Sequence, residues 1–83
     1  MKLKIVQPTA QREHEVVWIE ANTPDGNFVI QAGHATTTLV LSGNTDLIYC
    51  FKTGKQEILK INKDGAILSV TANLSIVLMR SDT

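Results

Sequence analysis

The sequence is poor in the residues that small proteins use for cross-links or for binding nucleic acids. It has one cysteine in 83 residues, so no internal disulfide can form, which fits a reducing compartment. Lysine plus arginine and aspartate plus glutamate each number eight. The chain therefore lacks the basic excess that is typical of nucleic-acid binding, and we exclude that class of partner.

Long apolar runs are missing too. No run approaches the ~18 residues that a membrane-spanning helix needs. The first residues, Met1–Val6, lack the apolar segment of a secretory signal. We therefore expect a cytosolic protein that reaches a membrane only through a partner. The length predicts a single domain over residues 1–83, and an apolar content of 43% is enough for one core.

The chain reads as short apolar, largely β-branched runs separated by turn residues, without a helical stripe. The expected strands are Lys2–Val6, Glu15–Ala21, Thr37–Leu41, Asp46–Phe51, Gln56–Ile61, Ala66–Thr71 and Leu74–Met79. Asp25-Gly26, Ser42-Gly43-Asn44, Thr53-Gly54-Lys55 and Asp64-Gly65 punctuate them. This spacing is typical of an all-β sandwich or barrel, and we predict a two-sheet sandwich of about eight to ten short strands.

Two local features of this pattern carry sharper expectations. Alternation within residues 15–21 places Val17 and Ile19 on one face of a strand and Val16 and Trp18 on the other. Asp64-Gly65, between two apolar runs, is the best signal for a tight hairpin, because such a turn needs positive φ at its centre.

Residues able to carry chemistry are few and scattered. His14 lies in a polar run expected to be an exposed turn, and His34 follows Gly33 at a corner. No metal-ligand spacing and no glycine-rich phosphate loop is visible, so we expect no metal and no cofactor. Cys50 lies in an apolar run, which favours a buried, inert thiol over a nucleophile paired with His34. Catalysis has little support, and we expect a protein that is not an enzyme.

The most distinctive stretch is Thr23–Ala35, which combines a turn, an alternating apolar step and a Gly-His-Ala corner. It resembles the acidic-Gly-acidic-Phe-Gly-Ile/Leu-x-Pro-Gly-His-Ala-Pro run of the epsilon subunit of F-type ATP synthases, the subunit called delta in mitochondria. The matching residues are Asp25, Gly26, Phe28, Ile30, Gly33, His34 and Ala35. The opening strand, ending near Pro8, and the segment Gly65–Val70 are loosely similar to other parts of that family's N-terminal β-sandwich.

Four positions depart from the family pattern. Asn27 replaces an acidic residue, Val29 a glycine, and Ala32 and Thr36 replace prolines. The C-terminal helical hairpin of typical epsilon subunits has no counterpart, so the resemblance implies neither its inhibitory extension nor its nucleotide site. These departures are typical of a divergent member or a paralogue.

The resemblance implies a non-catalytic rotor subunit. Such a sandwich links the gamma subunit to the membrane c-ring during ATP synthesis coupled to proton or sodium transport. It would lie at the cytoplasmic side of a bacterial inner membrane, as a peripheral part of the complex. An adaptor or binding paralogue without a rotor role is the alternative. The candidate partner-interface residues are Asp25, Asn27, His34 and Leu39, although Leu39 also fits a core position. Phe28 and Ile30 are expected to anchor the loop to the core.

Overall fold

Eight β-strands make up the computed structural model, which describes residues 1–80, and no helix occurs within those residues. The prediction of an all-β domain is therefore confirmed. The strands are β1 (Lys2–Gln7), β2 (Ala10–Thr23), β3 (Gly26–Gln31), β4 (Thr37–Leu41), β5 (Thr45–Phe51), β6 (Gln56–Ile61), β7 (Ala66–Val70) and β8 (Leu74–Met79).

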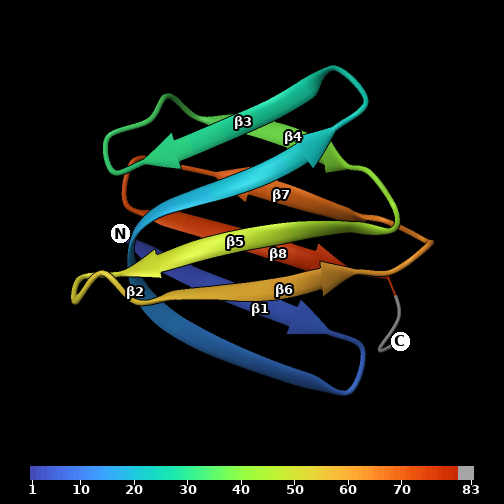
Figure 1. The fold of residues 1–83 in the computed structure, drawn as a ribbon, viewed down its shortest axis with the longest axis horizontal. Coiled ribbons are helices and arrows are strands. Elements are labelled where there is room, and N and C mark those ends of the chain that lie inside the picture. Colours follow the sequence, from blue (N-terminus) through green and yellow to red (C-terminus); the bar gives the residue numbers. More distant parts are fainter. Residues whose placement is uncertain (81–83) are drawn as a thin grey trace.

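The strands form one continuous sheet that folds over along β2 into two layers (Figure 1). The back layer has the order β4-β7-β8-β1 and ends on the first half of β2. The front layer consists of β3, the second half of β2, β5 and β6. All neighbours are antiparallel except β1 and β8, the first and last strands, which lie side by side in parallel.

The core fills the space between these two layers. Along β1 every second side chain points inward, so that Leu3 and Ile5 are fully buried. The front layer contributes Ile19, Leu47 and Tyr49, which are at most 1% exposed. Each fully buried side chain of this size stabilises the fold by about 1.5–3 kcal/mol. This burial holds the layers together without any cross-link.

Strand β2 is longer than expected, and its first half is not a turn. The polar run around His14 is strand, and His14 lies directly opposite the buried Leu3 of β1. The predicted exposed position of His14 is therefore wrong, because its ring stacks on Tyr49 with centroids 5.2 Å apart. The prediction failed because the first half of β2 has polar residues on its outer side and few apolar residues on its inner side.

A β-bulge divides β2 at the point where it passes from one layer to the other. The pairing with β5 shifts between Val16 and Trp18, so Val17 has no counterpart on β5. As a result Val16 and Ile19 both point into the core, at 2% and 0% exposure, and Val17 is 42% exposed. The predicted grouping of Val17 with Ile19 is wrong for this reason, since strict alternation cannot anticipate an inserted residue.

The connection at Asp64-Gly65 is a crossover and not the hairpin that the sequence predicted. It joins β6 in the front layer to β7 in the back layer, and these strands pair with different neighbours. Gly65 has φ +73°, and a Cβ atom there would lie 2.7 Å from the carbonyl oxygen of Leu41. The prediction of positive φ at this glycine is thus confirmed, but the turn leads to the other layer.

Candidate interaction surface

The predicted interface residues lie at separate places around β3. Asp25 is exposed in the two-residue turn between β2 and β3, which is braced by the Thr23 side chain. The hydroxyl of Thr23 donates to the carbonyl of Gly26 at 3.1 Å and accepts from the amide of Asp25 at 3.1 Å. His34 follows the other end of β3. A strand of this length separates the two by roughly 17 Å, so they cannot form one compact site.

His34 lies in a corner of the chain that is hydrogen-bonded to the connection between β7 and β8. The amide of Gly33 (φ +84°) donates to the carbonyl of Ala72, between β7 and β8, at 2.8 Å. The amide of His34 donates to the carbonyl of Gln31 at 3.1 Å. Its ring Nδ1 lies 2.8 Å from the carbonyl oxygen of Ala35, to which it donates in the tautomer with the proton on Nδ1. The partly exposed imidazole is thus held in place by its own loop.

Leu39 and the two expected anchors of the loop, Phe28 and Ile30, differ in how deeply they are buried. Leu39 lies opposite the buried Leu68 and packs against the core from β4. Ile30 is 1% exposed, as expected of an anchor. Phe28, at the open end of the same strand, is 38% exposed. The predicted anchoring is therefore confirmed for Ile30, whereas Phe28 keeps part of its ring at the surface.

Asn27 lies on the outer face of the front layer, beside Glu20. Its side-chain amide donates to Oε2 of Glu20 at 3.1 Å and to Oδ1 of Asn22 at 3.2 Å. An acidic residue at position 27 would instead place a second carboxylate next to Glu20. The departure from the family pattern at this position therefore turns a repulsion into a hydrogen bond.

Apolar side chains lie opposite Glu20 on both neighbouring strands of this face. In the strand register Val29 of β3 lies opposite Glu20 of β2, which lies opposite Ile48 of β5, which lies opposite Ile58 of β6. Trp18 lies one step further along β2 on the same side. Val29 and Ile58 are 51% and 59% exposed. We call Trp18, Glu20, Val29, Ile48 and Ile58 the front patch. Sequence reasoning did not single it out, because its members come from four strands whose register was unknown.

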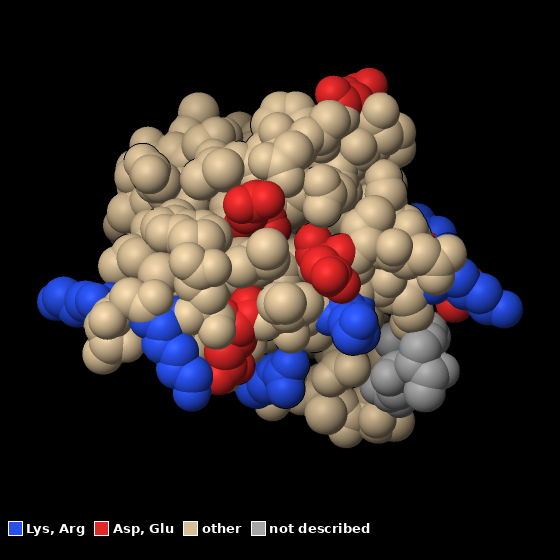
Figure 2. Space-filling model, viewed as in Figure 1, with Lys and Arg blue, Asp and Glu red and all other residues tan. Residues whose placement is uncertain are grey.

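Charge is unevenly distributed over this face. In Figure 2, which looks onto the front layer, acidic side chains lie at the top, in the middle and, among basic ones, in the lower half of the surface. Basic side chains occupy the lower half and the margins. Within the register the nearest acidic neighbour of the front patch along β5 is Asp46, and Lys60 lies opposite it on β6. The middle of the face is therefore apolar around Glu20, and the next acidic residue, Asp46, has Lys60 opposite it.

The outer face of the back layer also has an apolar row. Val40, Ile67, Leu78 and Val6 lie side by side across β4, β7, β8 and β1. Val40 is 58% and Leu78 49% exposed. The neighbouring charges here include Lys2, whose ammonium lies 3.6 Å from Glu13. The two outer faces thus share apolar content and differ in the charges that accompany it.

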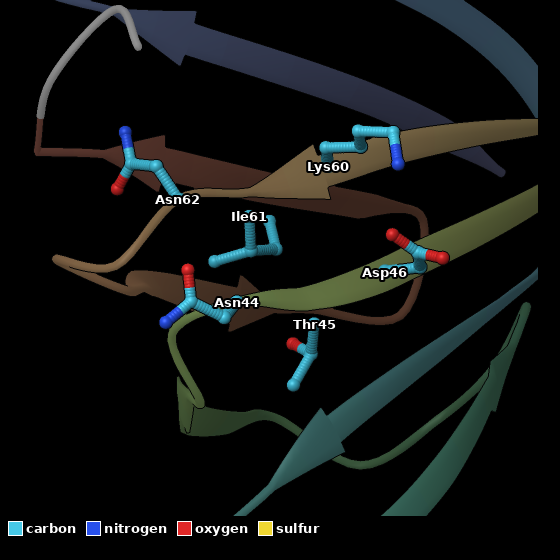
Figure 3. A pocket seen from close by; sticks show the side chains of 6 residues that line it. All are labelled: Asn44, Thr45, Asp46, Lys60, Ile61 and Asn62. Carbon is cyan, nitrogen blue, oxygen red and sulfur yellow. The ribbon is translucent and has the colours of Figure 1, made fainter.

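A shallow depression opens at the end of the front layer, where β5 begins and β6 ends (Figure 3). Its volume is about 330 Å³, and its lining consists of Asn44, Thr45, Asp46, Lys60, Ile61 and Asn62. None of the predicted interface residues lines it. Its polar side chains come from adjacent strand ends, and nothing in it resembles a nucleophile or a set of metal ligands.

An aromatic and polar cluster occupies the side of the sandwich between β2 and β6. His14 stacks on Tyr49, and Phe51 meets both rings edge-on at 5.6 and 5.7 Å. The Tyr49 hydroxyl donates to Oε2 of Glu57 at 3.1 Å. Burial raises the pKa of Tyr49 above its usual value, and the adjacent Glu57 carboxylate raises it further. The phenol is therefore neutral, and the cluster is a packed part of the structure.

The side chains that were considered for catalysis or metal binding are not arranged for either role. Cys50 is 5% exposed, and its Sγ donates to the carbonyl oxygen of Phe51 at 3.4 Å. Within residues 1–80, no three His, Cys, Asp or Glu side chains gather closely enough to hold a metal ion. The same part of the chain contains no helix of the length and hydropathy needed to cross a bilayer.

Comparison with known proteins places the fold in the class of small β-sandwich domains found within larger chains. No protein-family model and no curated protein matches the sequence. A similar solved structure is a chain of the Euglena gracilis mitochondrial ATP synthase (OSCP/F1/c-ring in rotational state 1). It has a TM-score of 0.81 over 90% of the present chain, at 20% identity. The present chain covers 47% of that chain, and at this identity the likeness establishes a shared fold.

Proposed function

We propose that this chain is a non-catalytic central-stalk subunit of an F-type ATP synthase, which links the gamma subunit to the membrane c-ring. The observation that supports it best is the coincidence of two independent likenesses. Seven residues between Asp25 and Ala35 match the epsilon pattern, and the fold resembles a chain of a mitochondrial ATP synthase over 90% of this chain.

The role requires a rigid body with two contact surfaces. The core of this sandwich is continuous between the layers, and both layers expose apolar side chains to solvent. Asp25 and Asn27 at one end of β3, and His34 at the other, are the residues that we assign to contacts with gamma and the c-ring. In this function the chain transmits torque and holds no cofactor. It lies on the cytoplasmic side of a bacterial inner membrane through its complex.

An adaptor paralogue that kept the fold and lost the rotor role is the second candidate. It is favoured by the four departures from the epsilon pattern, Asn27, Val29, Ala32 and Thr36, and by the absence of a matching family model. The two candidates differ in one observable property, which is a stable complex with the gamma subunit and c-ring of the same cell.

Co-purification tests the proposal. The tagged chain should retain gamma and the c-ring of its own organism through gel filtration, and failure to retain either would favour the adaptor. Replacing His34 with Ala should weaken this complex more than it lowers the melting temperature. If the variant binds gamma normally and melts much lower, His34 is a structural residue and its assignment to the interface is wrong.

A further inference from the structure

We propose that two copies of this chain pair through strand β4, edge to edge and antiparallel, so that their back layers join into one sheet. The partner is therefore a second copy of the same chain, and the same surface of each copy takes part in the contact. The proposal goes beyond the rotor role, because it concerns the chain in the absence of other subunits.

Strand β4 is an open edge of the back layer. Among the described strands it pairs with β7 alone, and it lies on the side of the sandwich away from the corner where β1 meets β2 (Figure 1). An edge strand carries N–H and C=O groups that its own sheet leaves unpaired. Such a row of groups is a template for a strand of another chain.

The outward backbone groups of β4 belong to Thr38 and Val40. At the β7–β8 turn the amide of Thr71 donates to the carbonyl of Leu74 at 2.8 Å, which sets the alternation of hydrogen bonds along β7. Counting back from Thr71 in steps of two, the residues of β7 opposite Thr38 and Val40 direct their bonds to β8. The N–H and C=O groups of Thr38 and Val40 therefore point away from β7.

Nothing within residues 1–80 takes up the outward groups of these two residues. The next amide in the same series, that of Ser42, lies beyond the end of β4 and donates to the carbonyl of Asn22 on β2 at 3.0 Å. Strand β3, the other edge on this side of the sandwich, is less open, because the carbonyl of Gln31 already accepts the amide of His34. Strand β4 is thus the edge with its outward groups free.

This edge lacks the features that keep strand edges apart. Residues 26–45 contain no Lys, Arg, Asp or Glu, and β4 contains neither a proline nor a shift in its register. The opposite edge, β6, contains Glu57 and Lys60 and follows Lys55. Charged side chains, prolines and bulges are the usual means by which an edge strand avoids pairing with another chain. Their absence distinguishes β4 from β6.

The sequence of β4 is complementary to itself in one register. A two-fold axis through Leu39 places Thr38 of one copy opposite Val40 of the other, and both side chains lie on the exposed face of the sheet. Because both residues have outward groups, each such pair exchanges both of its N–H···O=C bonds. The two Leu39 side chains meet on the inner face, where each packs against its own core. This contact buries no charge.

The contact is small, so the dimer is weak. Strand β4 has 5 residues, whereas a stable interface of standard size takes roughly 20–30 residues from each side. We expect a dissociation constant on the order of 100 µM. Sedimentation equilibrium of the 83-residue chain at concentrations around this value provides the measurement.

Hydrogen exchange of the wild-type chain, followed by NMR, locates the contact. The outward amides of Thr38 and Val40 are open to water in the monomer and bonded in the dimer. Their exchange should slow by about threefold when the concentration rises from about 50 µM to about 1 mM. The outward amides of β6 should exchange at an unchanged rate. A monomer at every concentration, or slowing at the edge amides of β3 or β6 instead, would overturn the proposal.

Proline substitution tests the pairing with a matched control. Val40→Pro removes an outward N–H group from β4, and Ile58→Pro removes one from β6. The outward direction at residue 58 follows from the bond between the Phe51 amide and the Lys55 carbonyl, which sets the alternation along β6. Val40 and Ile58 are both β-branched, lie in the middle of edge strands and are nearly equally exposed, at 58% and 59%.

Proline at such a position removes no hydrogen bond from its own sheet. We expect Val40→Pro to raise the dissociation constant by about tenfold or more, because it removes a donor and places its ring against the incoming strand. Ile58→Pro should change the constant by less than about twofold. Equal constants for the wild type and Val40→Pro, or an equal rise in both variants, would show that β4 is not the contact.

Circular dichroism and urea unfolding check that each variant is folded. If Val40→Pro does not fold, the exchange rates of the wild-type chain decide the question by themselves. These measurements contain no other subunit. A chain that stays monomeric would therefore end this proposal and leave the proposed rotor function as it stands.

Discussion

The side-chain amide of Asn27 on β3 donates a 3.1 Å hydrogen bond to Oε2 of Glu20 on the adjacent strand β2. The two residues are diagonal neighbours in the register, since Asn27 pairs with Asn22 and Glu20 with Val29. This contact joins a residue predicted from the sequence to one that was not. It also explains how a glutamate is accommodated beside Val29 and Ile48.

Asn27→Asp should lower the free energy of unfolding by about 0.5 kcal/mol at low salt, because it places a carboxylate beside Glu20. Added salt should reduce this loss, since the repulsion lies at the surface. Asn27→Ala is the control, because it removes the hydrogen bond without adding charge. Urea unfolding of both variants at low and high salt provides the measurement. A loss in Asn27→Asp that salt does not change would contradict the electrostatic explanation.

The bulge in β2 makes a prediction about two adjacent valines. Val16→Thr should destabilise the protein by about 1–3 kcal/mol, because it buries a hydroxyl in an apolar core. Val17→Thr, at an outward position, should change the stability by less than about 0.5 kcal/mol. The substitutions are chemically identical, so each controls for the other in thermal or urea unfolding. Equal losses at both positions would mean that β2 has no bulge at this point.

The bulge also marks where prediction from the sequence reaches its limit. The strand pattern and the turn residues were enough to predict an all-β sandwich, because alternation and positive-φ residues are local properties of the chain. The partners of each strand are not local. For this reason the sequence predicted a hairpin at Asp64-Gly65, where the structure has a crossover between the layers. The sequence also did not predict the front patch, because its residues come from four strands. Asn27 was predicted as an interface residue from the family pattern alone, and its contact with Glu20 was not predicted.

Tyr49 should make the stability fall at alkaline pH. Its pKa is raised above the usual value of 10.0, first by burial and then by Glu57, so the fold favours the neutral phenol. The contribution is fully present below about pH 10 and is lost as the pH rises through the raised pKa, because the unfolded chain ionises first.

The measurement is direct because Tyr49 is the single tyrosine of the chain. Tyrosinate absorbance should titrate above the usual pKa in the native protein and return to it in urea. Tyr49→Phe, which removes the ionising group, should flatten the alkaline part of the stability curve. If Tyr49 titrates normally in the native state, its hydroxyl is not held by Glu57 as described.

His14 offers a way to raise the stability of the fold. Its Nε2 atom is buried and has no hydrogen-bond partner among the described residues, whereas its ring packs on Tyr49 and Phe51. His14→Phe keeps the ring and removes the unpaired polar atom, so it should raise the free energy of unfolding by about 1 kcal/mol. His14→Ala, which removes the ring, should lower it by about 2 kcal/mol. Urea unfolding separates the two effects. Destabilisation by both substitutions would show that Nε2 has a hydrogen-bond partner in solution, and that the imidazole is retained for that bond.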